Sequence, residues 1–395
     1  MASENPSCRK TYGVPLYCVS CVPLDRINII NNNDEDHQDQ SKEQEIPKHP
    51  TSDRLFVALG GGGGEGHSGI PNAVVLSTFD FASRSLSDEP VFRLGMDGEL
   101  PYRMAMHPNG DGFVCSFPKS CRLFEWDFLE NKELLAMKPS EKILSKLEDV
   151  GQQLALAFNV EGSILATGGE DGHLRVFKWP SMEIILDQTD ANNAIKDLDF
   201  SYDSKYLVSL WSKGPSRLWD LTSAAAAASL QREDGEMFGF CRFSQSSGEN
   251  QMLYATAMHG KYGKIISWNV GSWQRVGSKK IVRDGISAFN VSPDGKLLAV
   301  GTFEGDVIII NSSNMQPMTT VKKAHLGIVT SLAFSQGSRV LLSASFDSTA
   351  RVTLIEDKKK NGMNIMLILL VLLFSFLVYY LLNRRDLWQS QLPYQ

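Results

Sequence analysis

One strand-and-turn pattern recurs six times in this chain of 395 residues. Each copy ends an apolar strand and continues into a turn rich in polar residues and glycine. The copies read MHPNG at 106–110, FNVEG at 158–162, FSYDS at 200–204, FSQSS at 243–247, VSPDG at 291–295 and FSQGS at 334–338, with starts 42 to 52 residues apart. Such a period indicates a fold built from one repeated supersecondary unit, because each unit can bury its apolar face only against its neighbours.

Two further strand patterns follow each of these turns. After the copy at 158, one short apolar strand covers 164–168 (ILATG) and another covers 174–179 (LRVFKW), with a second turn between them. A period of roughly 40 to 45 residues with four strands per unit is typical of a β-propeller of the WD-repeat type. Trp126-Asp127, Trp219-Asp220 and Ala324-His325 are weakened forms of the Trp-Asp and Gly-His signatures.

The amino-terminal part of the chain contains one more unit of this kind. Residues 17–22, 55–59 and 74–79 match its first, second and third strands, so the sequence predicts an all-β, seven-bladed propeller. The last blade is incomplete, because little chain remains for an outer strand after 350–355 (ARVTLI). Either residues 1–13 supply that strand or the blade has three strands.

A glycine-rich loop, residues 60–72, separates the second and third strands of the first unit. It opens on five glycines, Gly60 to Gly64, and closes on the sequence GIPN at 69–72. Glycine lacks Cβ, so a partner or ion can approach the main chain closely there. The G-x-G-x-x-G pattern at 64–69 is not followed by a helix, and the loop contains no lysine, so nucleotide-fingerprint and P-loop interpretations fail.

Two interpretations of the glycine-rich loop remain. On composition alone it could be a flexible hairpin linker. Pro71 fixes its own φ and also restricts Ile70, which favours a shaped loop that presents backbone carbonyls and the Asn72 side chain.

Composition and charge exclude several other classes. Hydrophobic residues make up 43% and charged residues 21% of the chain, which excludes wholesale disorder. A net charge of −6 offers no basic field, so we expect no nucleic-acid partner. Cys18 and Cys21 form a C-x-x-C pair with no second pair at zinc spacing, and an odd separation on a strand places their thiols on opposite faces. We expect free cysteines that are buried or half-buried.

The carboxyl-terminal region reads as a membrane anchor. Residues 363–382 are apolar except for Asn364 and Ser375, and at 1.5 Å per residue they would span roughly 30 Å, the thickness of a bilayer's hydrocarbon core. The first residues show no signal peptide. We therefore expect a cytosolic propeller over 1–357, a basic flank and transmembrane helix over 358–382, and a short luminal tail over 383–395.

Two segments depart from the repeat. Residues 28–50 carry six acidic residues and two lysines with little apolar content, which predicts an exposed, disordered insertion. The alanine run at 224–228 is expected to lie in the loop after blade four, without an assigned role.

Taken together, a divergent seven-bladed WD propeller, a GGGG…GIPN loop in its first blade and one carboxyl-terminal anchor resemble a known family. These are the endoplasmic-reticulum guanine-nucleotide exchange factors that initiate COPII coat assembly by loading a Sar-type small GTPase with GTP, and the short luminal tail resembles a plant-like member. The resemblance runs from Tyr17 to the membrane span. It implies a single-pass protein of the endoplasmic-reticulum membrane, with the GTPase and COPII components as partners and no bond-breaking chemistry of its own.

The resemblance also implies how the loop works. A structural potassium ion would be held mainly by backbone oxygens of Gly61, Gly62, Gly63 and Gly64, with Asn72. Ile70, Pro71 and Asn72 would form the exchange site, with Asn72 entering the nucleotide site of the GTPase. Because a side chain on an exposed turn has nothing to pack against, we expect replacement of Asn72 to leave folding unchanged.

A second hypothesis comes from a related branch of membrane-anchored WD proteins that lack this loop and help transporters leave the endoplasmic reticulum. On that hypothesis the chain is a scaffold or cargo-exit chaperone, and the loop is vestigial. The chain retains the loop, which favours exchange.

Overall fold

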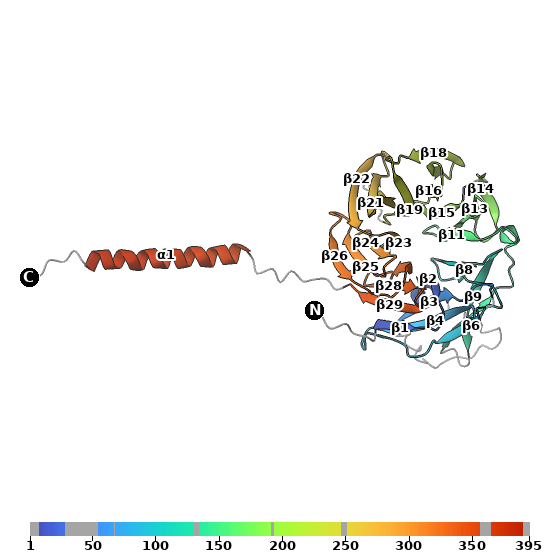
Figure 1. Cartoon of the computed structure of the whole chain (residues 1–395), viewed down its shortest axis with the longest axis horizontal. Helices are drawn as coiled ribbons and strands as arrows, with labels where there is room; N and C mark the ends of the chain where they lie inside the picture. The colour runs from blue at the N-terminus through green and yellow to red at the C-terminus, as the bar shows by residue number, and fades with distance from the viewer. Residues whose placement is uncertain are drawn as a thin grey trace, which may run out of the picture. The chain divides into compact units, whose positions relative to one another are not determined.

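Seven antiparallel sheets form a ring in the computed structural model of the chain (Figure 1). The structure describes residues 8–27, 54–66, 68–129, 134–190, 193–245, 251–355 and 365–389. The chain divides into two compact units, residues 1–355 and 356–395. The first unit is the propeller, and the prediction of seven all-β blades is confirmed. The expected acidic insertion at 28–50 lies outside the described residues.

Each blade is a small sheet whose strands follow the chain from the ring's centre outward. Blade one contains β2 (Leu16–Cys21), β3 (Arg54–Gly61), β4 (Ala73–Asp80), β5 (Ser85–Leu86) and β6 (Phe92–Gly95). Blades two and three contain β7 (Arg103–Met106), β8 (Phe113–Ser116), β9 (Cys121–Leu129) and β10 (Leu134–Pro139), then β11 (Gln153–Phe158), β12 (Ile164–Gly169), β13 (His173–Lys178) and β14 (Glu183–Thr189). Blades four and five contain β15 (Ile195–Phe200), β16 (Tyr206–Trp211), β17 (Ser216–Asp220) and β18 (Ala225–Leu230), then β19 (Glu236–Phe243), β20 (Met252–His259), β21 (Tyr262–Asn269) and β22 (Arg275–Val282). Blade six contains β23 (Ile286–Val291), β24 (Leu297–Thr302), β25 (Val307–Asn311) and β26 (Pro317–Val321), and blade seven contains β27 (Val329–Phe334), β28 (Val340–Ser345) and β29 (Thr349–Leu354).

The six sequence repeats coincide with the ends of the inner strands. Strands β7, β11, β15, β19, β23 and β27 each end at the first residue of a predicted copy, from Met106 in blade two to Phe334 in blade seven. The turns that follow use hydroxyl and amide side chains to satisfy the backbone. For example, Ser292 Oγ accepts the Leu297 N–H at 2.9 Å and donates to Asp294 Oδ1 at 2.6 Å. This local chemistry explains why the turns recur in the sequence.

The amino-terminal segment closes the ring. Strand β1 (Arg9–Thr11) pairs antiparallel with β29, with Lys10 opposite Ala350 (Figure 1). Of the two possibilities left open by the sequence, an outer strand supplied by the first residues is therefore correct. Blade seven is built from both ends of the propeller's chain, and β1 leads directly into β2 of blade one.

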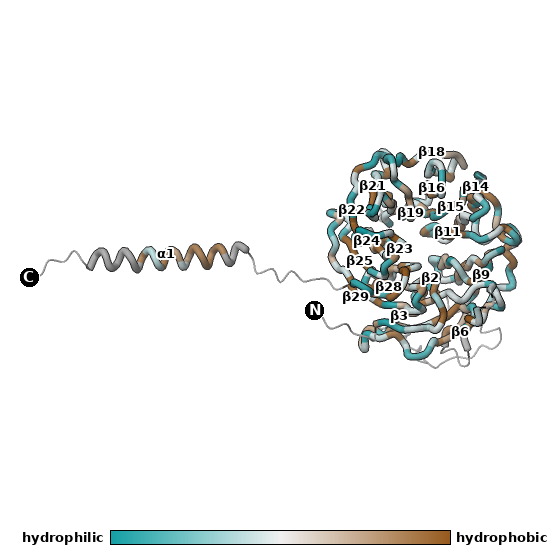
Figure 2. Tube along the Cα trace, viewed as in Figure 1, coloured by the Kyte–Doolittle hydropathy of each residue, from teal (hydrophilic) through white to brown (hydrophobic). Residues whose placement is uncertain are grey.

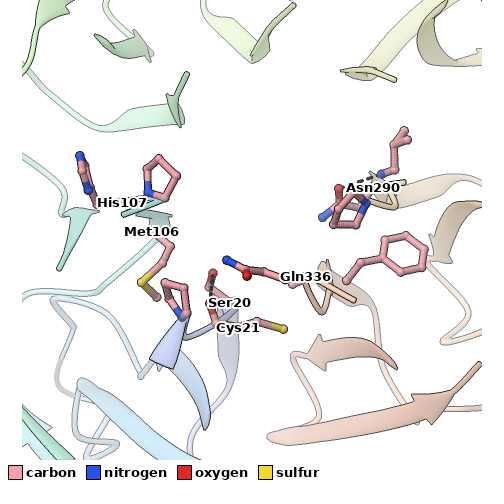
Figure 3. Close-up of a pocket in the computed structure, with 12 residues that line it drawn as sticks. Ser20, Cys21, Met106, His107, Asn290 and Gln336 are labelled. Carbon is pink, nitrogen blue, oxygen red and sulfur yellow. Dashed lines mark hydrogen bonds between the residues drawn. The ribbon is translucent and has the colours of Figure 1, made fainter. Parts of the chain in front are cut away.

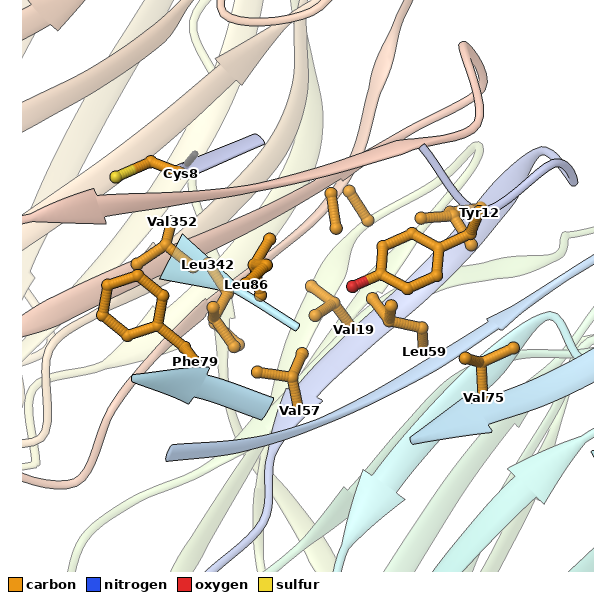
Figure 4. Close-up of a cluster of buried hydrophobic side chains, with 14 of the residues drawn as sticks. Cys8, Tyr12, Val19, Val57, Leu59, Val75, Phe79, Leu86, Leu342 and Val352 are labelled. Atoms are coloured by element: carbon orange, nitrogen blue, oxygen red, sulfur yellow. The ribbon is translucent and has the colours of Figure 1, made fainter. Parts of the chain in front are cut away.

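Apolar side chains fill the spaces between neighbouring blades. The cluster between blades seven and one includes Val57, Phe79 and Leu342, all nearly inaccessible to solvent, together with Tyr12 (Figure 4). Both faces of a central strand are covered, so β28 is buried along its whole length. This double burial explains why the middle strands read as continuous apolar runs in the sequence.

The alanine run forms a strand, which corrects the expectation of a loop. Strand β18 pairs with β17, with Ala228 opposite Leu218 and Ala225 opposite Asp220. Most of these alanines are exposed at the outer edge of blade four. Alanine has weak strand preference, but the edge of an already formed blade offers backbone partners that override it.

The described residues of the second unit form one helix, α1 (Ile365–Gln389). Its side chains over 369–381 are exposed and mostly hydrophobic (Figure 2). Among the residues that the structure describes, no helix has both the length and the apolar character needed to cross a membrane, so the span expected at 358–382 is not seen there.

Candidate functional site

The glycine-rich loop connects the second and third strands of blade one, as the sequence predicted. Its first two glycines continue the sheet, because Gly60 lies opposite Val74 and Gly61 lies opposite Ala73 in the β3–β4 ladder. The connection proper therefore covers residues 62–72, which is shorter than the predicted 60–72. Two ordered strands fix both of its ends.

Asn72 ends this connection and makes most of its internal contacts, and its side chain is buried rather than exposed. Its side chain is 6% accessible. Asn72 Oδ1 accepts the Gly64 N–H at 2.9 Å, and Asn72 Nδ2 donates to the Gly64 carbonyl at 3.2 Å. Its own carbonyl accepts the Met96 N–H at 2.9 Å, which joins the loop to β6. The expectation of an exposed side chain without contacts was wrong, because the loop folds back over the amide.

Close approach explains the glycines at the start of the connection. A Cβ at Gly61 would lie 2.0 Å from the Pro15 carbonyl oxygen, and one at Gly62 would lie 2.1 Å from Asn72 Oδ1. The Gly62 N–H also donates to the Pro15 carbonyl at 2.9 Å. The close contacts that these glycines permit are therefore made within the chain, by Asn72 and by the segment between β1 and β2.

The rest of the connection is shaped by backbone angles and one serine. Gly64 and Gly69 have φ of 83° and 72°, in the left-handed region that favours glycine. Ser68 Oγ donates to the Gly63 carbonyl at 3.4 Å and accepts the Ile70 N–H at 3.3 Å. These bonds support the shaped-loop interpretation over the flexible linker. They leave Ile70 and Pro71 exposed at the surface, with Ile70 39% accessible.

Of the oxygens expected to hold potassium, those of Gly62, Gly63, Gly64 and Asn72 belong to this connection. The carbonyls of Gly63 and Gly64 and the side-chain oxygen of Asn72 each accept one internal hydrogen bond. A carbonyl oxygen has a second lone pair, so these bonds do not exhaust its capacity to bind a cation. Gly61 lies within the ladder of β3 rather than in the turn.

Acidic and imidazole side chains gather elsewhere, in blade five. Within the described part of the chain, Glu233, Glu236 and His259 form the one group spaced to hold a metal ion. The Lys264 ammonium occupies its centre, 2.9 Å from Glu236 Oε1 and 3.2 Å from His259 Nδ1. The group is therefore an internal ion pair network in this structure.

A pocket of about 250 Å³ lies at the other end of the inner strands (Figure 3). Cys21 at the end of β2, Met106 at the end of β7 and Phe334 at the end of β27 line it, with Asn290 and Gln336. The glycine-rich loop adjoins the start of β2, at Leu16. The pocket and the loop therefore belong to opposite faces of the propeller.

Cysteine placement follows the sequence prediction. All six cysteines are free; Cys18 is buried, whereas Cys21 is half-buried. Burial raises the pKa of the Cys121 thiol to about 12, which keeps it protonated and unreactive at neutral pH.

Comparison with known proteins gives consistent similarities. The WD domain, G-beta repeat family matches residues 148–178 and 315–353. The chain is 46% identical to SEC12-like protein 2 of Arabidopsis thaliana over 90% of each chain, and 34% identical to SEC12-like protein 1 of the same plant over 73% of each chain. It is also 25% identical to the guanine nucleotide-exchange factor SEC12 of Mus musculus, over 60% of this chain and 63% of the mouse protein.

Proposed function

The chain belongs to the SEC12-like protein family, and we propose that it is a guanine-nucleotide exchange factor for a Sar-type small GTPase. On this proposal it releases GDP and allows GTP to bind at the endoplasmic reticulum, which initiates formation of COPII vesicles. The similarity to mouse SEC12, a named exchange factor, supports the activity class. The observation that carries the proposal is the ordered loop at 62–72, which exposes Ile70 and Pro71 and is held by Asn72.

Exchange requires no bond to be broken in the nucleotide. A protein that binds the empty GTPase more tightly than the loaded one must weaken nucleotide binding by the same factor, because the two equilibria are linked. A loop that is already folded loses little conformational freedom when it docks. The internal hydrogen bonds of residues 62–72 supply that order before the partner arrives.

We assign different roles to the three predicted exchange residues. Ile70 and Pro71 are exposed and would make the first contact with the GTPase. Asn72 would keep the loop in its binding shape, and its amide would reach the nucleotide site only by exchanging its bonds to Gly64 for bonds to the GTPase. Both roles make Asn72 necessary for exchange.

We also propose potassium as the loop's structural cofactor. The donors are neutral oxygens of Gly62, Gly63, Gly64 and Asn72, gathered in one short connection, and each accepting oxygen keeps a free lone pair. Oxygens of this kind can replace the hydration shell of potassium. When bound, the ion would supply a fixed positive charge that holds these dipoles together, and Gly61 would contribute only from the edge of β3.

The proposed location is the endoplasmic-reticulum membrane, with the propeller in the cytosol. The apolar sequence at 363–382 and the exposed hydrophobic side chains of α1 support attachment to a lipid phase. Alkaline extraction of microsomes should leave the chain in the membrane pellet, and external protease should digest the propeller. A propeller that resists protease until detergent is added would overturn this placement.

The central experiment measures release of fluorescent GDP from a purified Sar-type GTPase. We expect the full chain to accelerate release well above the intrinsic rate, and Asn72→Ala to abolish most of that acceleration. A folded parent chain that leaves the release rate unchanged would show that the exchange proposal is wrong.

A membrane scaffold or cargo-exit chaperone is the second candidate function. It is kept because the two relatives of higher identity are named only as SEC12-like proteins, and those names state no exchange activity. Under this function the chain would bind a membrane cargo without changing GDP release, and the Asn72 variant would behave like the parent.

A further inference from the structure

Exposed hydrophobic side chains of blades six and seven lie on the same face of the propeller as the glycine-rich loop. In every blade the connection between the second and third strands and the link to the next blade emerge at one face, because the strands alternate in direction. Phe303 and Phe346 lie in such connections of blades six and seven, and Leu326 lies in the link between those blades. Their exposures are 51%, 40% and 80%.

Hydrogen bonds connect the segments that carry these side chains to one another and, through residues 12–15, to the glycine-rich loop. The His325 N–H donates to Gly305 in blade six at 3.0 Å, and the Leu326 N–H donates to Asp347 in blade seven at 2.6 Å. The Tyr12 N–H donates to the Ser348 carbonyl at 2.8 Å. Three residues after Tyr12, the Pro15 carbonyl accepts the Gly62 N–H. The exposed side chains and the loop are therefore carried by one continuous series of hydrogen-bonded segments.

Aromatic rings fill the space along this support. Tyr17 packs edge-on against Phe346, with ring centroids 4.8 Å apart, and its ring lies 5.9 Å from that of Tyr102. The Arg103 guanidinium lies 4.6 Å from the centroid of the Tyr102 ring and donates to the Tyr17 carbonyl. We name the five residues Phe303, Leu326, Phe346, Tyr17 and Tyr102 the apolar arc.

Leu326 is the most exposed member, and its position is rigidly held. Asp347 accepts not only the Leu326 N–H but also a hydrogen bond from Arg9 at 3.1 Å. The preceding residue, His325, is completely buried between Thr349 Oγ1 and Ser343 Oγ, each at 2.7 Å. A leucine fixed in this way can enter a partner's pocket with little loss of freedom, which is typical of an interface anchor.

The small size of the loop and the charges beside the arc indicate which partner the arc binds. A stable interface buries about 800 Å² on each partner and uses about 20 to 30 residues per side. The loop at 62–72 is smaller than that, so a partner held there needs contacts beyond it. The charged neighbours Arg9, Asp347 and Arg103 are engaged within the propeller. Glu304 and Lys323, next to Phe303 and Leu326 in the chain, form an exposed ion pair with each other, so the arc presents apolar side chains bordered by paired charges.

We propose that the apolar arc is the second contact surface for the GTPase, anchored by Leu326 and continuous with the glycine-rich loop. The inference rests on the exchange function proposed above. On it, the loop acts on the nucleotide site while the arc holds an apolar surface of the same GTPase molecule. Loss of the arc weakens association, whereas loss of the loop removes exchange.

The test compares Leu326→Ser with Val160→Ser, a control at an exposed aliphatic residue, 39% accessible, in the turn between β11 and β12 at the opposite face of the propeller. The full chain is assayed for binding of nucleotide-free Sar-type GTPase and for GDP release at several concentrations of the GTPase. We expect Leu326→Ser to weaken binding about tenfold and to raise KM with little change in kcat. The control should match the parent, and both variants should melt like the parent because the replaced side chains are exposed.

Each result has a distinct meaning. If Asn72→Ala stops exchange while Leu326→Ser and a second variant, Phe303→Ala, bind like the parent, the arc inference is wrong and the exchange function stands. If the parent binds the GTPase without releasing GDP, the exchange function fails, and the binding measurements alone decide on the arc. If the parent does not bind the GTPase, or if Leu326→Ser instead disrupts a dimer of this chain, the assignment of the arc to the GTPase is overturned.

Discussion

The side-chain amide of Asn72 pairs with both main-chain groups of Gly64, accepting from its N–H at 2.9 Å and donating to its carbonyl at 3.2 Å. This pairing imitates one rung of a β-ladder within a turn. It makes the shape of the connection depend on a single side chain that can both donate and accept. The loop, and blade seven to which residues 9–15 connect it, can be tested by substitution, ion replacement and pH.

Replacement of Asn72 should affect the loop as well as the partner. Asn72→Ala removes two hydrogen bonds from a buried site, each worth about 1 kcal/mol, so we expect lower stability of the loop and nucleotide release slower by at least tenfold. Asn72→Asp keeps the acceptor for the Gly64 N–H but places a carboxylate against the Gly64 carbonyl. It should therefore lie between the parent and Asn72→Ala. Stopped-flow GDP release and hydrogen exchange at Gly64 measure both effects, and parent-like values for Asn72→Ala would contradict the role of this residue.

Gly62 and Gly66 form a matched pair of sites in the same loop. A Cβ at Gly62 would collide with Asn72, at 2.1 Å from Oδ1, whereas a Cβ at Gly66 meets no atom within 4 Å. We expect Gly62→Ala to displace Asn72, with an overpacking penalty of about 1–3 kcal/mol and loss of most exchange activity. Gly66→Ala should retain the parent's melting temperature and activity. Equal activity of the two variants would show that the packing of Asn72 on Gly62 is irrelevant to exchange.

Potassium should influence the loop without influencing the propeller. If carbonyls of residues 62–64 hold the ion, replacing potassium with lithium or sodium should speed hydrogen exchange in the loop and weaken GTPase binding. Thermal melting should stay nearly unchanged, because the interblade clusters contain no part of this connection. Identical hydrogen exchange in all three salts would rule out an ion-organised loop.

Acid should weaken blade seven through Asp347. Burial opposes ionisation of this carboxyl, but the His325 imidazole 3.7 Å away and hydrogen bonds from Thr349 and the Leu326 N–H outweigh it and hold its pKa well below the ordinary value. A depressed pKa means that the unfolded chain binds the proton more tightly, so the stabilisation is complete above the unfolded pKa of about 4 and is lost as pH falls below it.

The matching variant is Asp347→Asn, which cannot ionise. The difference in melting temperature between the parent and this variant should be largest near pH 6 and should shrink as pH falls from 4 to 3. Burial lowers the pKa of His325, and Asp347 opposes that lowering. A difference that stays constant from pH 6 to pH 3 would contradict an ionised Asp347.

The inner strands could be predicted from the sequence, whereas the edges of the blades could not. Turns after Phe200 or Val291 recur because each must satisfy the same backbone groups with nearby side chains. The outer strands are held by a neighbouring strand and carry little apolar pattern of their own. The alanines of β18 and the short β1 therefore gave no local signal of their pairing.

The candidate site was located by sequence but not described correctly by it. Glycine content and Pro71 marked a shaped loop between β3 and β4, although β3 extends through Gly61 and the loop begins two residues later than predicted. The burial of Asn72 depends on where residues 62–64 pass in space, which spacing along the chain does not determine. The contact of Gly62 with Pro15 also escaped prediction, because it joins segments separated by a whole strand and the insertion.

The pairing of β1 with β29 has a consequence for the time at which the glycine-rich loop is completed during synthesis. The loop is made early, within the first blade, and Pro15 beneath it is made earlier still. However, the segment that carries Pro15 is fixed at its other end by Arg9, Lys10 and Thr11, whose partners in β29 are made last. A nascent or truncated chain that lacks Thr349–Leu354 leaves this segment free at one end. The support of the glycine-rich loop is therefore complete only when the last blade of the propeller has been made.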